Sequence, residues 1–81
     1  MENLVSLDAL RVGQCARVID LKTDGSIRRR LLDIGLIPGT SVRCIFKSPS
    51  GDPTAFLVRG AVIALRSEDC KKIKGVAYGA Y

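Results

Sequence analysis

The chain has 81 residues, of which 47% are hydrophobic, and this size allows one domain with one small core. It contains no histidine, and its three cysteines, Cys15, Cys44 and Cys70, form no CxxC pair. Neighbouring residues therefore cannot assemble a zinc cluster or a cysteine–histidine nucleophile. We expect reduced cysteines that act as small buried hydrophobic residues, no cofactor and no tight transition-metal site. Weak metal binding by carboxylates stays open.

The formal net charge is +5, from thirteen Lys and Arg against eight Asp and Glu. This excess favours an acidic partner, which is nucleic acid, an anionic membrane surface or an acidic protein patch. With two Phe, two Tyr and no Trp, the chain lacks a stacking platform for single-stranded nucleic acid. No apolar run approaches the ~18 residues of a membrane-spanning helix, and no signal pattern opens the chain. These features predict a cytoplasmic protein.

The first elements in chain order are a leader, a strand and a turn. The leader carries three leucines that can pack: Leu4, Leu7 and Leu10. After Gly13 the pattern alternates as in a strand, with Ala16 and Val18 on one face and Arg17 on the other. The residues "KTDG" that follow are typical of a turn.

A short helix is predicted next, with Ser26 as its N-cap. Its apolar residues share one face at i, i+4 and i+7: Ile27, Leu31 and Ile34. Gly35 fits the C′ position with left-handed backbone, and Leu36 can then contact Leu31 in a Schellman motif. The residues "IPGT" predict a type II turn directly after the helix.

The rest of the chain is rich in strand formers. In "TSVRCIFK" the alternation places Val42, Cys44 and Phe46 on one face. The strands "TAFLV" and "AVIAL" are joined by "RG" as a tight hairpin, and Ser67 caps a helical turn in "RSEDC". "KKIKGV" predicts a closing strand, whose "KKIK" lysines suit a solvated sheet edge. The fold class predicted is mainly all-β: a small closed barrel of about five strands with one short helix after the first strand.

Three consecutive arginines, Arg28, Arg29 and Arg30, follow the predicted start of the helix. Each cation near a helix N-terminus opposes the dipole by ~0.3–1 kcal/mol, so a sequence chosen for stability alone would place acids there. Successive helical residues are ~100° apart, so the three side chains cannot all hold one anion. The conflict favours a contact with an acidic partner, while a solvated helix face remains the alternative.

No catalytic constellation occurs in the sequence, and we expect no enzyme. "GDP" at residues 51–53 is ordinary turn chemistry at Asp52 and Pro53, and no phosphate-binding P-loop is present. The last residues, "AYGAY" at 77–81, have little to pair with and predict a disordered tail. Tyr78 and Tyr81 are the alternative there, as anchors for a partner.

Four segments in order resemble the ferrous iron transport protein A (FeoA) family: "LxxLxxGxxxxV", "RRRLLDIGLIPGT", "SPSGDP" and "VIALRSEDCKKIKG". The resemblance extends from about Leu4 to Val76 and implies a single SH3-like domain at residues 1–76. It also implies a small cytoplasmic accessory of the membrane ferrous iron transporter FeoB, which carries a cytosolic G-protein domain. Such a protein lies at the inner face of the membrane when it is bound to the transporter. Cys70 departs from the pattern, since alanine is commoner there.

The expected docking surface is the arginine-bearing helix with its neighbouring loops, that is Arg28, Arg29 and Arg30 with Asp52 and Pro53. Two alternatives remain open. One is a small barrel that binds nucleic acid, which the net charge favours and the scarcity of aromatic residues disfavours. The other is a GTPase activator, in which one of the three arginines stabilises transition-state charge on the nucleotide of the transporter.

Overall fold

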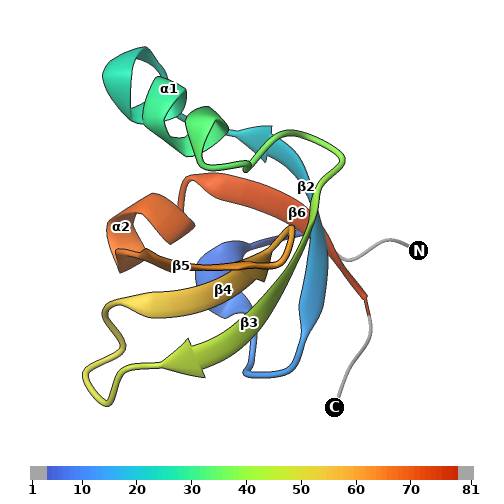
Figure 1. The fold of residues 1–81 in the computed structure, drawn as a ribbon, viewed down its shortest axis with the longest axis vertical. Coiled ribbons are helices and arrows are strands. Elements are labelled where there is room, and N and C mark those ends of the chain that lie inside the picture. The colour runs from blue at the N-terminus through green and yellow to red at the C-terminus, as the bar shows by residue number, and fades with distance from the viewer. Residues whose placement is uncertain (1–3, 79–81) are drawn as a thin grey trace.

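The computed structural model describes residues 4–78, which form one curved antiparallel sheet with three short helices (Figure 1). The six strands are β1 (Leu4–Ser6), β2 (Cys15–Leu21), β3 (Ser41–Lys47), β4 (Thr54–Val58), β5 (Ala61–Leu65) and β6 (Ile73–Tyr78). The helices are the 3₁₀ helix η1 (Leu7–Ala9), α1 (Gly25–Asp33) and α2 (Ser67–Cys70). The strand order is β1-β6-β2-β3-β4-β5. The mainly β class is confirmed, with six strands in the described residues rather than about five.

The leader is more ordered than the sequence indicated. It forms β1, which pairs with β6, and then η1, so α1 follows the second strand rather than the first. Leu7 and Leu10 are buried as expected, but Leu4 is 64% exposed. Leu4 lies opposite Val76 in the β1–β6 pair, and this pairing holds its side chain on the solvent side of the sheet.

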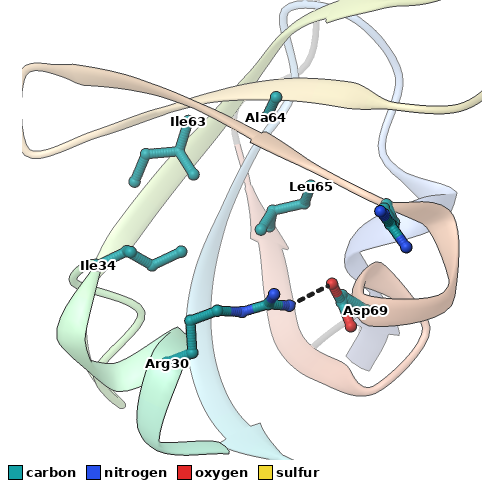
Figure 2. Close-up of a pocket in the computed structure, with 7 residues that line it drawn as sticks. Arg30, Ile34, Ile63, Ala64, Leu65 and Asp69 are labelled. Carbon is teal, nitrogen blue, oxygen red and sulfur yellow. Dashed lines mark hydrogen bonds and ion pairs between the residues drawn. The ribbon is translucent and has the colours of Figure 1, made fainter. Parts of the chain in front are cut away.

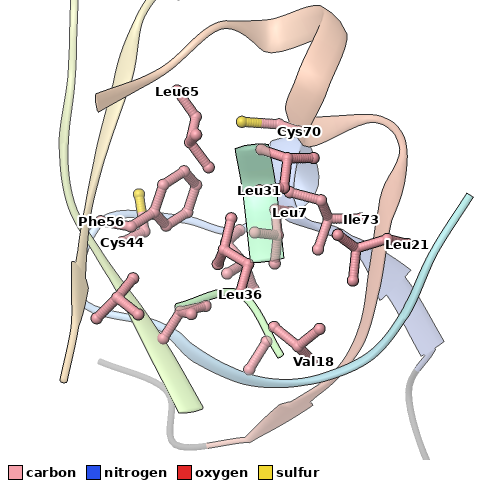
Figure 3. Packing of buried hydrophobic residues seen from close by; sticks show 14 residues of the cluster. Leu7, Val18, Leu21, Leu31, Leu36, Cys44, Phe56, Leu65, Cys70 and Ile73 are labelled. Carbon is pink, nitrogen blue, oxygen red and sulfur yellow. The ribbon is translucent and has the colours of Figure 1, made fainter. Parts of the chain in front are cut away.

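The core lies on the concave side of the sheet, and α1 and η1 contribute to it (Figure 3). Its buried members are Leu7, Leu10, Ala16, Val18, Leu21, Leu31, Leu36, Val42, Cys44, Phe56, Val58, Leu65, Cys70 and Ile73. The prediction that Phe46 joins Val42 and Cys44 was wrong, because the β3–β4 register shifts between Cys44 and Phe46. The extra residue of this bulge reverses the alternation, and Phe46 is 56% exposed.

β6 lies inside the sheet, between β1 and β2, so the prediction of a solvated edge strand was wrong. Gly75 of β6 faces Val18, where an added Cβ would lie 2.7 Å from the carbonyl oxygen of Arg17. Only glycine allows the two strands this approach. β6 also includes Ala77 and Tyr78, which were expected in a disordered tail, while Tyr81 lies outside the described residues.

The helix α1 begins earlier than predicted. Asp24 occupies the N-cap position, so Ser26 lies within the first turn. The C-terminus matches the predicted Schellman motif: Gly35, at φ +105°, donates to Leu32 at 3.0 Å, and Leu36 donates to Leu31 at 3.1 Å.

The predicted apolar stripe of α1 is only partly correct. Leu31 is fully buried and Ile34 packs against the core, but Ile27 is 37% exposed.

Two predicted turns are confirmed. Thr40 donates to Ile37 at 2.9 Å around a glycine of positive φ, and the two residues "RG" connect β4 to β5.

Candidate functional site

Arg28 is used inside the fold. Its Nη1 donates to the carbonyl oxygen of Leu21 at 2.9 Å and to that of Thr23 at 3.5 Å. These bonds tie α1 to the end of β2. Because the helix starts at Gly25, Arg28 is its fourth residue and lies beyond the first turn. The conflict with the helix dipole is therefore weaker than the sequence indicated.

Arg30 joins the two α-helices. Its Nη2 lies 3.0 Å from Oδ2 of Asp69 in α2 (Figure 2). The arginine side chain is 62% exposed, whereas that of Asp69 is 8% exposed. Arg30 also lies in the last turn of α1, where a cation interacts favourably with the helix dipole. The ion pair thus holds α1 against α2 and provides the nearly buried carboxylate with its cation.

Arg29 remains available to a partner. It is exposed, and within residues 4–78 no hydrogen bond or ion pair joins it to another group. The three consecutive arginines therefore have three different environments, and they do not converge on one anion. Their spacing around the helix predicted the divergence, but not which of them would stay unpaired.

The loop at residues 48–53 stabilises α2. Oδ1 of Asp52 accepts a hydrogen bond from the backbone N–H of Ser67 at 3.0 Å, so Asp52 satisfies a donor at the helix N-terminus. The prediction that Ser67 caps this turn was wrong, since the N-cap position is Arg66 and its side chain makes no cap bond. Pro53 is exposed next to Asp52. The predicted site residues thus adjoin α2 from two sides, with Arg30 at Asp69 and Asp52 at Ser67.

A pocket of about 250 Å³ opens between α1, β5 and α2 (Figure 2). It is lined by Arg30, Ile34, Ile63, Ala64, Leu65, Arg66 and Asp69. Its lining combines aliphatic side chains with charged ones, in which Arg30 pairs with Asp69 and Arg66 lies 3.8 Å from Oε1 of Glu68. Sequence reasoning found only Arg30 of this set as a site residue. The β5 and α2 residues carried no signal, because they approach α1 only through the tertiary fold.

The two buried thiols, Cys44 and Cys70, offer little chemistry at neutral pH. Cys44 and Cys70 are buried, and burial raises the pKa of both, to about 12 for Cys70. Cys15 is half-buried and accepts a hydrogen bond from Nε of Arg43 at 3.4 Å. Residues 4–78 contain no group of three or more His, Cys, Asp or Glu placed to hold a metal ion. In the same range, none of the helices has the length and apolar character needed to cross a bilayer.

Solved structures support the fold. The FeoA protein of Chlorobium tepidum is 27% identical with a TM-score of 0.84, and the match covers 95% of this chain and 74% of that one. The FeoA of Stenotrophomonas maltophilia, solved with zinc and described as an SH3 domain protein, is 28% identical with a TM-score of 0.78 and 88% coverage of both chains. A manganese-dependent transcriptional repressor is 19% identical with a TM-score of 0.85, so it shares the fold alone.

Sequence comparison gives the same relationship. A fusion protein of Porphyromonas gingivalis, Fe(2+) transport protein A/Fe(2+) transporter FeoB, is 28% identical over 68 residues. This match covers 84% of the chain, which spans 8% of the length of the fusion protein. The model of the FeoA domain matches residues 5–76. The chain therefore belongs to the FeoA family and has its SH3-like fold.

Proposed function

We propose that the protein is a non-enzymatic accessory of ferrous iron uptake that docks on the cytosolic G-protein domain of a FeoB-type transporter. The observation that carries this proposal is the fusion relative, in which a segment similar to this chain and a Fe(2+) transporter share one polypeptide. Covalent linkage gives two domains a high effective concentration, which is useful when they act in contact. The proposal places the chain in the cytoplasm, at the inner face of the membrane when it is bound.

The docking surface in this proposal consists of the exposed side chain of Arg29 on α1 and of the pocket beside the helix. Ile27 is also exposed, but it lies about 200° from Arg29 around the helix axis and so belongs to another face of α1. At the pocket, the aliphatic lining residues suit an apolar partner side chain, and Arg66, whose exposed side chain is paired with Glu68 at 3.8 Å, suits an adjoining carboxylate. Asp52 is engaged by Ser67, so we assign it a supporting role and place Pro53 at the margin of the surface.

Binding of the full chain to the purified G domain of the transporter tests the proposal. Arg29→Gln should weaken binding several-fold and reduce its salt dependence, because a charge at an interface acts mainly on association. Arg11→Gln is the matched control, since Arg11 is also exposed but belongs to a loop between η1 and β2. Both variants should keep the melting temperature of the unmodified protein. Equal binding by all three proteins would contradict the proposed docking surface. No binding by the unmodified protein would contradict the proposed partner.

The environments of the three arginines also bear on which of them would act in the GTPase-activator alternative. Of the three consecutive arginines, Arg28 and Arg30 already have partners within the fold, which supports Arg29 as the first candidate for an arginine that enters the nucleotide site of the transporter. Such an arginine is worth ~10³-fold or more in the rate of GTP hydrolysis. The same proteins, added at saturation to the G domain, test this. Unchanged hydrolysis with bound protein would retain the accessory role and exclude the activator.

A further inference from the structure

The outer face of β2 to β5 carries a group of side chains that the docking proposal does not use. We call it the sheet-face patch, and it consists of Arg17, Arg43, Phe46, Leu57 and Val62. The strand register makes it contiguous: Arg43 lies opposite Leu57, and Leu57 lies opposite Val62. Phe46 follows on the same face, and Arg17 lies on the neighbouring strand β2, opposite Ser41 beside Arg43.

The apolar members of this patch stand in solvent. Phe46 is 56% exposed, Val62 is 66% exposed and Leu57 is 37% exposed. Phe46 lies opposite Ala55, and Ala55 lies opposite Ala64. These small residues on the same face leave the larger side chains projecting. The bulge in β3 is what directs Phe46 outward, so the backbone itself presents an aromatic ring to the surroundings. Clustered exposed apolar side chains of this kind mark interaction surfaces.

The charged side chains of the patch are Arg17 and Arg43, and both are exposed on this face. Arg43 also has partners within the protein, Sγ of Cys15 at 3.4 Å among them. Among residues 4–78, Asp20 is the sole acidic residue within a strand, at the far end of β2, where Lys22 pairs with it at 3.0 Å and lowers the pKa of its carboxyl. The patch therefore complements an anionic partner. A second copy of the chain is a poor occupant, because face-to-face packing would bring arginines of both copies together.

We propose that the sheet-face patch rests on the anionic surface of a lipid bilayer. The core fills the concave side of the sheet, so the patch lies on the convex side (Figures 1 and 3). A bilayer interface accepts single aromatic and aliphatic side chains that project from such a surface. The arginines lie beside them at the level of the lipid phosphates. Contact with lipid on this face leaves α1 and its pocket available to a protein partner.

Cosedimentation of the full chain with vesicles tests the proposal. One set contains phosphatidylcholine alone, and the other is an equimolar mixture with phosphatidylglycerol. The protein should bind the anionic vesicles better, and less so as salt is raised. The double variant Phe46→Ser with Arg17→Gln should bind them at least fivefold more weakly, since an arginine near an anionic surface contributes ~1 kcal/mol. The matched control, Ile27→Ser with Arg29→Gln on α1, should bind like the unmodified protein.

Val62→Thr keeps the β-branched shape at an edge strand and provides a second test if the double variant does not fold. It should also reduce vesicle binding, with an unchanged melting temperature. Unchanged binding by a folded patch variant, or no preference for anionic vesicles, overturns the proposal. The proposal is also overturned if vesicle binding is absent and the patch is instead needed for binding to the G domain, to an oligonucleotide or to a second copy of the chain in sedimentation. Any of these three interactions would assign the face to that other partner.

Discussion

Replacement of Leu31 by Ala should remove much of the stability of this domain. Leu31 is fully buried and comes from α1, where it packs among the residues that the sheet encloses (Figure 3). The change deletes three carbon atoms, whose transfer from water is worth ~0.8 kcal/mol each. The cavity that persists raises the loss to about 3–4 kcal/mol, within the ~2–5 kcal/mol found for buried leucines. A domain of this size has ~5–15 kcal/mol in total.

Thermal and urea unfolding measure this loss. At ~4–8 °C for each kcal/mol, the melting temperature should fall by roughly 12–30 °C, and the urea midpoint should fall without a change of slope. Ile27→Ala is the control, because Ile27 lies one turn earlier on the same helix and is 37% exposed. It should cost less than about 1 kcal/mol. An unchanged midpoint for Leu31→Ala, or equal losses for both variants, would refute the placement of α1 on the core.

Two further variants test other parts of the fold. Asp52→Ala removes the acceptor of the Ser67 N–H and should cost about 0.5–1 kcal/mol in urea unfolding, while Asp52→Asn should retain most of it; equal losses would exclude a capping role. Cys70→Ala tests the raised thiol pKa. The folded protein keeps the Cys70 proton up to about pH 12, whereas the unfolded chain loses it near pH 9, so the free energy of unfolding should fall between these values by up to ~1.4 kcal/mol per pH unit. The free energy of unfolding of Cys70→Ala should therefore fall less steeply over this pH range than that of the unmodified protein. Parallel pH profiles for both proteins would contradict the raised pKa of Cys70.

The features that the sequence determined by itself are those set within a few residues. Gly35 and Leu36 specify the end of α1 because a left-handed residue followed by an apolar one closes the helix locally. Gly60 favours the β4–β5 hairpin because a type I′ connection of two residues has positive φ at both positions, as Arg59 and Gly60 do here. The mainly β class followed from such local patterns, and the family followed from the order of four motifs along the chain.

The tertiary structure decided which distant side chains pair and which side chains are buried or exposed. Arg30 and Asp69 are 39 positions apart, and Asp52 and Ser67 are 15 apart, so no local spacing could pair them. Alternation along β3 predicted that Phe46 is buried, and one extra residue in the ladder reversed this.

"KKIK" leads into β6, and the interior position of β6 depended on β1, a strand of three residues that the sequence presented as a loose leader. Helix ends and tight turns depend on backbone conformation over a few bonds, which the residues themselves restrict. Strand neighbours, bulges and ion pairs between helices depend on which distant segments the collapse of the core brings together.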